Sequence, residues 1–307
     1  MIKQTMINTI KKIFYEPERI PLVFVRDKHF FPDFFVVKIQ YRAITRQKLS
    51  LNNPLLFNEK LQWLKLYGQE IDCSNLADKY EVREYISNVI GDEYLIPLYG
   101  VWNTFDEIPF DKLPNEFVLK CTHDCGSIYI CREKYSMDMD NVSKYFRKRL
   151  AYNYYWNTRE KQYKNIKPRI IAEKLMIDES GGDLKDYKIF CFNGKPKIIQ
   201  VDFDRFTNHK RNFYSLEWDY QPLSVKFPTD PNVIIQKPKC LDLMLELARK
   251  LSIGKTHVRV DLYVINSKIY FGELTFIHGG GYEIFDPPEW NRIFGDWIKL
   301  PKLAKKN

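Results

Sequence analysis

The sequence predicts an α+β fold built mainly from antiparallel strands. Runs of β-branched and aromatic residues occur in pairs joined by short polar turns, as in residues 186–205, where Asn193-Gly194 is a strong hairpin signal. Segments with helical periodicity lie between these pairs without alternating with single strands, so the βαβ units of a parallel sheet are not expected. The glycine motifs of Rossmann and P-loop sites do not occur.

The composition is that of a folded globular protein. With 307 residues, of which 45% are hydrophobic and 15% aromatic, the chain has room for one large or two medium domains. No run of about 18 apolar residues predicts a membrane-spanning helix, and the N-terminus lacks the apolar segment of a signal peptide. The six cysteines therefore indicate reduced thiols, and we expect a cytoplasmic protein.

The net charge of +9 is concentrated near the N-terminus, where residues 1–50 contain ten Lys or Arg against four acids. Such a balance suits nucleotide phosphates, anionic glycans or an anionic membrane. No nucleic-acid-binding motif accompanies it, so we expect no nucleic acid partner. Two interpretations of residues 2–14 stay open. This basic amphipathic segment either contacts the inner face of the membrane peripherally or packs on the domain, as such helices do more often.

The first elements follow from periodicity and capping. Helices are expected at 57–67 and 73–91, the second starting at Ser74 or Asn75 and ending at Gly91. A strand with a turn follows at 93–102, and a turn-rich connector at 106–114.

The remaining elements complete two groups of strands. They are a strand, small polar loop and strand at 116–131, a helix at 139–154, a strand at 168–176, the hairpin 186–205, a basic-aromatic loop at 209–220, a helix at 240–252 and a hairpin at 257–276.

The last hairpin has a predicted register. A three-residue loop of Asn266, Ser267 and Lys268 separates an apolar face from a charged one. The expected pairs are Ile265 with Ile269, Val264 with Tyr270, Val260 with Leu274, Asp261 with Glu273 and Arg259 with Thr275. The expected core face holds Val258, Val260, Leu262, Val264, Tyr270, Leu274 and Phe276.

Two carboxylates in opposed positions repel each other, so a positive charge is expected between Asp261 and Glu273. Arg259 supplies one in an ordinary surface ion-pair cluster. A Mg²⁺ ion is the alternative, because it binds one or two carboxylates together with phosphates and water. Gly279-Gly280-Gly281, just after the second strand, allows a backbone to approach a ligand closely. A zinc site is not expected, because the spacing of Cys121, His123, Cys125 and Cys131 fits no zinc template.

The ordered series of these motifs resembles the ATP-grasp fold of carboxylate–amine ligases. The stretches FVLKCTHDCGSIYIC, DYKIFCFNGKPKIIQVDFDR and VRVDLYVINSKIYFGELTF resemble, more closely, the TupA-like ATP-grasp family of cell-surface polysaccharide biosynthesis, named for teichuronopeptide synthesis. The resemblance covers about residues 55–297. It implies an ATP-grasp domain of two α+β subdomains that grip ATP, at about 115–185 and 186–298. A basic extension (1–54) and a pre-ATP-grasp region (55–114) come before this domain, and a basic tail (299–307) follows it.

The resemblance also implies roles for individual residues. Nucleotide-binding positions are Lys120, Gly126, Ser127, Glu173, Lys174, Leu175, Met176, Asp186 and Lys188, with Glu173–Met176 as the adenine hinge and Asp186 toward the ribose. The catalytic positions include Arg259, which is expected to stabilise the transition state. They also include the basic residues Arg205, Lys210 and Arg211, and the sequence does not show which of these contacts the phosphate or the substrate. Metal positions are Asp261, Glu273 and Thr275, the last standing where many ligases have Asn.

The function implied is an ATP- and Mg²⁺-dependent ligase that forms an amide through an acyl phosphate. Its carboxylate and amine substrates are expected to be glycan-linked. Two alternatives stay open: an ATP-grasp phosphotransferase with a hydroxyl acceptor, and a nucleotide-sugar glycosyltransferase that uses Asp202-x-Asp204 to hold a metal. The D-x-D pattern is common by chance, and the chain lacks the parallel-sheet pattern that such transferases need.

Overall fold

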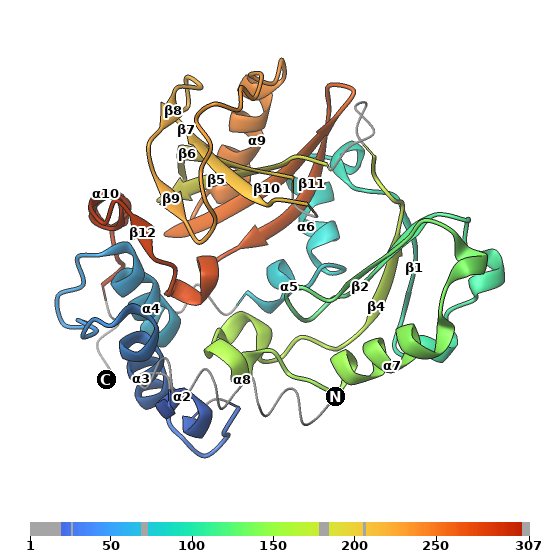
Figure 1. Ribbon diagram of the computed structural model, residues 1–307, viewed down its shortest axis with the longest axis horizontal. Helices are drawn as coiled ribbons and strands as arrows, with labels where there is room; N and C mark the ends of the chain where they lie inside the picture. Colours follow the sequence, from blue (N-terminus) through green and yellow to red (C-terminus); the bar gives the residue numbers. More distant parts are fainter. Residues whose placement is uncertain (1–19, 26, 69–72, 178–183, 205–206, 303–307) are drawn as a thin grey trace.

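The computed structural model describes residues 20–25, 27–68, 73–177, 184–204 and 207–302 (Figure 1). The amphipathic segment at 2–14 and Arg205 lie outside this part. The helices are α2 (Ile20–Val25), α3 (Asp33–Thr45), α4 (Phe57–Tyr67), α5 (Ser74–Ala77), α6 (Val82–Val89), α7 (Met139–Leu150), α8 (Tyr155–Thr158), α9 (Leu241–Ser252) and α10 (Glu289–Trp297).

The strands form two main antiparallel sheets, which confirms the predicted α+β class. The smaller sheet has the order β1 (Leu98–Trp102), β4 (Ile170–Glu173), β2 (Phe117–Cys121), β3 (Ile128–Cys131). The larger has the order β11 (Lys268–Thr275), β10 (His257–Ile265), β5 (Asp186–Phe192), β6 (Lys195–Phe203), β7 (Lys210–Tyr214), β8 (Tyr220–Gln221). A short ribbon pairs β9 (Ser224–Val225) with β12 (Phe285–Asp286).

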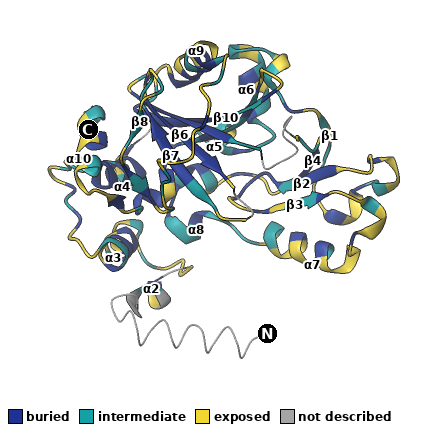
Figure 2. Cartoon of the chain, turned by 45° about the horizontal axis from the view of Figure 1, so that its top comes forward, coloured by how far each residue is buried: buried dark blue, intermediate teal, exposed yellow. Residues whose placement is uncertain are grey.

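The six-stranded sheet is the centre of the main core, and Figure 2 shows its strands as the most deeply buried part of the molecule. Helix α9 covers one face with Met244, Leu247 and Leu251, none more than 1% exposed. The four-stranded sheet has its own core with α7, centred on Phe117, Leu119 and Phe146. Each sheet is therefore packed separately.

Helix α4 has the predicted bounds and connects the N-terminal region to the larger sheet. Lys60 donates to the carbonyls of Gly295 and Ile298 at the end of α10, at 2.8 and 2.7 Å. These bonds satisfy carbonyls at a helix C-terminus, where a positive charge is favourable.

The predicted helix at 73–91 is two helices, α5 and α6, because Asp78 interrupts it. Its carboxylate accepts the backbone N–H of Tyr80 (2.7 Å) and of Glu81 (3.2 Å) and a bond from Arg169 (2.8 Å). Such local side-chain bonds compete with helix continuation.

The predicted helix at 139–154 ends at Leu150, and Asn153 then accepts the Tyr155 backbone N–H (3.0 Å) at the start of α8. The predicted strands at 93–102 and 168–176 are shorter, as β1 and β4.

The predicted loop at 209–220 was wrong, because residues 210–214 form strand β7 against β6. Arg211, Asn212, Phe213 and Tyr214 are all buried. A strand buried on both faces lacks the apolar–polar alternation that identifies strands in a sequence.

The last hairpin keeps the predicted pairing near the acids but not at its tip. Asp261 pairs with Glu273, and Arg259 with Thr275. The turn, however, has two residues, Asn266 and Ser267, both with positive φ, so Val264 pairs with Ile269. Gly272 is the extra residue of a β-bulge that restores the register. Ile269 and Phe271, rather than Tyr270, therefore face the core.

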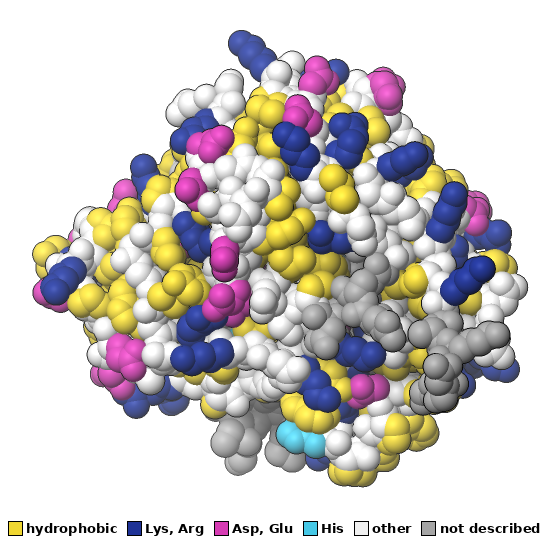
Figure 3. Space-filling model, turned by 180° about the vertical axis from the view of Figure 1, so that it is seen from behind, with side chains coloured by type: hydrophobic (Ala, Val, Ile, Leu, Met, Phe, Trp, Pro, Cys, Tyr) yellow, Lys and Arg dark blue, Asp and Glu magenta, His cyan; other side chains and the backbone are white. Residues whose placement is uncertain are grey.

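The surface adds two observations. No described helix is long and apolar enough to cross a bilayer. On the face shown in Figure 3, Lys and Arg side chains of the described residues are scattered among acidic and hydrophobic ones.

Candidate active site

The charged end of the β10–β11 hairpin forms a compact cluster around Arg259. Its Nη2 donates to Asp261 Oδ2 (2.7 Å), to Glu273 Oε1 (3.1 Å) and to the Thr275 hydroxyl (3.1 Å). Its Nε donates to Asp261 Oδ1 (2.7 Å), so the guanidinium holds Asp261 with two parallel bonds. The Thr275 hydroxyl donates to Glu273 Oε1 (2.8 Å). The strand register alone brings these four residues together.

Lys188 on β5 completes the cluster from the other side of β10, opposite Asp261 in the register. Its Nζ donates to Asp261 Oδ2 (2.6 Å) and to Asp186. Burial opposes the charge of Lys188, but Asp186 and Asp261 raise its pKa. The site thus holds cations and carboxylates in a dry setting, where their interactions are stronger than in water.

The two opposed acids have different environments. Asp261 is 1% exposed, and burial raises its pKa to about 6 against the pull of Arg259 and Lys188. Burial also opposes the charge on Glu273, but Arg259 and Lys188 lower its pKa to about 2. The Glu273 side chain is 44% exposed, and Glu273 lines a cavity. Glu273 is therefore the acid that a ligand meets first.

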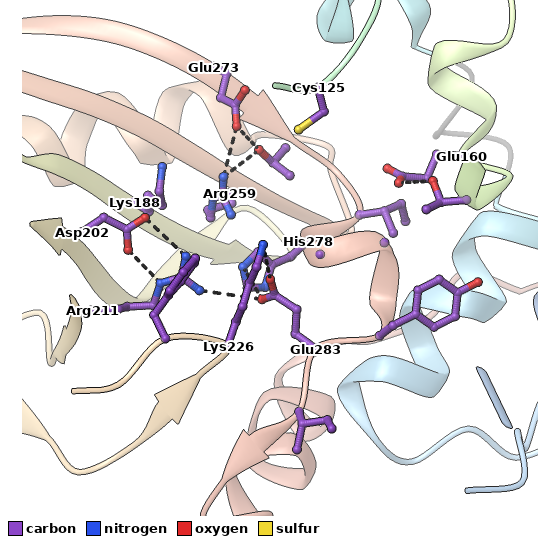
Figure 4. A pocket seen from close by; sticks show the side chains of 18 of the residues that line it. Cys125, Glu160, Lys188, Asp202, Arg211, Lys226, Arg259, Glu273, His278 and Glu283 are labelled. Atoms are coloured by element: carbon purple, nitrogen blue, oxygen red, sulfur yellow. Dashed lines mark hydrogen bonds and ion pairs between the residues drawn. The ribbon is translucent and has the colours of Figure 1, made fainter. Parts of the chain in front are cut away.

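That cavity has a volume of about 1130 Å³. The larger sheet contributes Lys188, Asp202, Arg211, Arg259, Glu273 and Thr275 to its lining, and the β2–β3 loop contributes Cys125 (Figure 4). Further lining comes from residues 277–284, from residues 224–228 and from segments near α3 and α8. The volume is sufficient for a ligand of ordinary substrate size.

Arg211 on β7 is bound to a second acidic pair. Its Nε donates to Asp202 Oδ1 (2.7 Å), and its Nη1 lies 3.8 Å from Glu283 Oε2. Although burial raises the pKa of Asp202, Arg211 outweighs it and keeps that pKa well below the usual range. His278 Nε2 lies 3.0 Å from Glu283 Oε2. Arg211 thus faces the cavity as part of a rigid network.

The glycine run after β11 is fixed from behind by α4. Gln62 Nε2 donates to the Gly281 carbonyl and Lys65 Nζ to the Gly280 carbonyl, both at 2.7 Å. Gly279, Gly280 and Gly281 all have positive φ, which glycine adopts without strain. Gly279 and Gly280 line the cavity, so a ligand meets backbone there without side chains.

The predicted nucleotide positions of the smaller sheet lie on neighbouring strands. Lys120 on β2 donates to Glu173 Oε2 on β4 (2.7 Å), and Arg83 reaches Glu173 Oε1 (3.4 Å). The Lys174 backbone N–H donates to Pro97 (2.9 Å), its side chain is exposed, and Leu175 and Met176 are half-buried. Lys120 and Glu173 are thus brought together, on a different sheet from the Arg259 cluster.

The loop between β2 and β3 is held by Asp124, which is fully buried. Arg149 Nε donates to Asp124 Oδ2 (2.7 Å), and the Ser127 hydroxyl donates to Oδ1. Gly126 is exposed with φ +84°, and a Cβ there would meet no atom within 4 Å. Ser127 is therefore committed to the loop itself, whereas Gly126 leaves open space.

Lys210, predicted together with Arg211, does not line the cavity, and two of the cysteines lie away from it. Lys210 points away from Arg211 and pairs with Asp230. Cys121 and Cys131 are buried in the core of the smaller sheet, whereas Cys125 is exposed. Within the described residues no group of three or more His, Cys, Asp or Glu is arranged to hold a metal.

Sequence reasoning missed most of the cavity beyond the hairpin. Cys125, Glu160, Lys226 and Glu283 line it from four separate segments. Spacing along the chain gives no signal for such contacts, because only tertiary packing brings them together. His278 is 3% exposed and also lines the cavity.

The oxygen ligands present fit a Mg²⁺ ion. Asp261 and Glu273 are two carboxylates at one point of the sheet. Glu273 lines the cavity, and its Oε2 makes no hydrogen bond to the described residues. Both oxygens of Asp261 accept bonds from Arg259 or Lys188, so Asp261 would exchange one of these bonds for the ion. Mg²⁺ takes few protein ligands and completes its shell with phosphate oxygens and water. The Thr275 hydroxyl is engaged with Arg259 and Glu273 and orients the acid.

A comparison with protein families gives a match to the TupA-like ATP-grasp model over residues 59–299. The chain belongs to the TupA-like ATP-grasp family. The match confirms the predicted family and the predicted ATP-grasp fold. No curated protein matches the chain.

Solved structures similar to the chain include three ATP-grasp proteins. A D-alanine–D-alanine ligase from Bacillus anthracis in complex with ATP is 15% identical, with a TM-score of 0.38 over 70% of this chain and 56% of that one. An L-amino acid ligase from Bacillus licheniformis is 11% identical (TM-score 0.43, 73% and 49%). N5-carboxyaminoimidazole synthetase from Staphylococcus aureus with ADP is 14% identical (0.42, 74% and 54%). The chain spans about half the length of these structures, and the proposals below do not rest on them.

Proposed function

We propose that the protein is an ATP- and Mg²⁺-dependent ligase that joins a carboxylate to an amine during the synthesis of a cell-surface polysaccharide, such as a capsule, O-antigen or teichuronopeptide. The observation that carries the proposal is the Arg259 cluster, with Asp261, Glu273 and Lys188, at a cavity that Cys125 of the β2–β3 loop also lines. Family membership supports the use of ATP and the link to surface polysaccharides.

The chemistry needs the charges that the cluster supplies. A free carboxylate does not acylate an amine, because oxide would have to leave. In the proposed reaction a carboxylate oxygen attacks the γ-phosphorus of ATP and ADP leaves. The amine then attacks the acyl carbon, and phosphate leaves with the electron pair. Arg259 and Lys188 lie where negative charge would gather on the transferred phosphoryl group.

Asp261 and Glu273 are the residues that would hold Mg²⁺, which when bound neutralises charge on the phosphate oxygens. Arg259 and Thr275 keep Glu273 oriented toward the cavity. Of the basic residues predicted to act beyond β6, we assign Arg211 to the substrate side, because it lines the cavity while Lys210 pairs with Asp230.

The adenine side is assigned to the smaller sheet. We propose that Lys120 and the hinge Glu173–Met176 bind the base and the phosphates and that Gly126 lets the loop approach them. Asp186, buried against Lys188, would then act through the lysine or toward the ribose. We place the reaction in the cytoplasm, where ATP is available, and retain the basic N-terminus as the candidate membrane contact.

The glycosyltransferase alternative is not carried forward. The chain belongs to the TupA-like ATP-grasp family, and Arg211 and Gln200 hydrogen-bond the Asp202 carboxylate. A phosphotransferase that uses the same ATP site stays the second candidate, because the cluster can stabilise phosphoryl transfer to any oxygen.

Hydroxylamine trapping distinguishes the two. The protein is incubated with ATP, Mg²⁺, hydroxylamine and a panel of sugar acids and amino acids, and products are read by mass spectrometry. A ligase forms a hydroxamate from one of the acids together with ADP. A phosphorylated sugar without a hydroxamate would instead establish the phosphotransferase.

A further inference from the structure

The cavity has a second charged wall, opposite the Arg259 cluster. Glu160 lies just after α8 and is 4% exposed, and it lines the cavity across from Lys188 and Arg259 (Figure 4). The Thr158 hydroxyl donates to its Oε1 (2.6 Å) and Gln162 Nε2 to its Oε2 (2.9 Å). These bonds fix a buried carboxylate beside the cavity with acceptor capacity left on each oxygen.

Two tyrosines frame Glu160. Tyr154 and Tyr163 both line the cavity and pack edge to face, with ring centroids 4.9 Å apart. Burial first, and then the charges of Glu160 and Glu273, raise the pKa of Tyr163. Tyr163, Glu160 and Glu273 all line this cavity, so the Glu160 wall and the metal position share one space.

The nearest cation behind the wall does not neutralise it fully. Lys65 is completely buried and bonded to the Gly280 carbonyl, and burial lowers its pKa to about 7. It makes no ion pair within 4 Å to the described acids. Burial raises the pKa of Glu160 and lowers that of Lys65, while each charge favours the other. On the cavity side the Glu160 carboxyl keeps oxygen acceptors for the hydrogen bonds of an ammonium or amine group.

We propose that the Glu160 wall, formed by Tyr154, Thr158, Glu160 and Tyr163, is the binding site for the amine substrate of the ligase. An ammonium or amine group is a hydrogen-bond donor, which matches a carboxylate acceptor and the faces of aromatic rings. The opposite wall, with Lys188, Arg211 and Arg259, matches the carboxylate and phosphate groups. The inference rests on the proposed function and assigns its two substrates to opposite sides of one cavity.

The test is ligand-observed saturation-transfer NMR on the full chain with Mg²⁺ and a non-hydrolysable ATP analogue. The probes are glycinamide, L-alaninamide and L-lysinamide, with lactamide as the neutral counterpart of alaninamide. We expect at least one amine to bind, lactamide to bind more weakly, and Glu160→Gln to weaken amine binding about tenfold or more, the loss of one charge-assisted bond. Glu217→Gln, at an exposed acid, is the matched control.

A second variant keeps the test valid if Glu160→Gln does not fold. Ile44 on α3 lines the cavity, and Ile44→Trp should block the amine without touching Glu160. Equal binding of alaninamide and lactamide, amine binding unchanged in a folded Glu160→Gln or Ile44→Trp variant, or no amine binding at all would each overturn the inference. Calorimetry of the ATP analogue on the same samples separates this result from a failure of the proposed function.

Discussion

Asp261 on β10 and Glu273 on β11 are register partners, and both accept a hydrogen bond from the same nitrogen, Nη2 of Arg259. One guanidinium therefore keeps the buried Asp261 carboxylate together with the Glu273 carboxylate that lines the cavity. In the proposed function these residues hold the charge of ATP. Single substitutions at them therefore have specific expected effects on stability and on ligand binding.

Removing Arg259 should destabilise the fold. Arg259→Met leaves two facing acids without their shared cation, and such a loss costs about 3–5 kcal/mol at buried sites. Urea unfolding should show this, and millimolar Mg²⁺ should restore part of it by binding the freed acids. Arg292→Met removes an exposed i,i+4 partner of Asp296 and should cost about 0.5 kcal/mol or less. Equal losses in the two variants would contradict the account.

Binding of Mg²⁺ with the ATP analogue should depend on pH through Asp261. Its raised pKa, about 6, means that the carboxyl is ionised above that pH and takes up a proton as pH falls through it. A proton competes with the metal, so affinity should decrease from pH 7.5 to pH 5.5. Isothermal calorimetry across that range measures it. In Asp261→Asn this part of the decrease should disappear, and an unchanged pH dependence would show that another group is responsible.

The glycine run should not tolerate a side chain. In Gly281→Ala the new Cβ would lie 2.4 Å from Gln62 Nε2, at a φ of +75°. Strain and the disturbed Gln62 contact should lower the free energy of unfolding by about 2 kcal/mol. Gly254→Ala has a similar φ of +74° with open space around it, so it should cost only about 1 kcal/mol. Thermal unfolding compares them, and the order should not reverse.

Cys125 should report on nucleotide binding. It is exposed and lines the cavity from the β2–β3 loop, whereas Cys121 and Cys131 are buried. Although the residue is exposed, desolvation of its thiol by the surrounding protein, and then the charge of Glu273, raise its pKa, so labelling by a maleimide should be slow and should speed up at alkaline pH. A bound ATP analogue should protect Cys125 but not Cys73, as peptide mass spectrometry would show. Labelling of Cys125 at the same rate with and without the analogue would place the nucleotide elsewhere.

Features that depend on residues close together in the sequence could be predicted, whereas features that depend on contacts between distant residues could not. Helix α4 and the pairing of Asp261 with Glu273 depend on local periodicity and could be predicted. The bulge at Gly272 could not be predicted. A two-residue turn followed by a bulge pairs Asp261 with Glu273, and so does a three-residue turn without a bulge. Strand β7 was missed because both its faces are buried.

The residues of the site also divide into those that the sequence pattern predicts and those that only tertiary packing brings together. The residues of one hairpin were predictable as a group, since strand pairing follows from the sequence pattern. Glu160 and Glu283 reach the cavity from segments about 120 residues apart, and only the packing of α8 and of residues 277–284 against the larger sheet brings them there. Which of Lys210 and Arg211 faces the cavity could likewise be decided only once these residues were known to form a strand, because neighbouring residues of a strand face opposite ways.

The most direct test of the central claim is calorimetry of a non-hydrolysable ATP analogue with and without Mg²⁺, beside a UDP-sugar, on the wild type and on Asp261→Asn/Glu273→Gln. The account predicts that the wild type binds the analogue only with Mg²⁺ and that the double variant, while folded, loses this binding or binds at least about tenfold more weakly. Binding of the UDP-sugar without the ATP analogue, unaffected by the double variant, would contradict it.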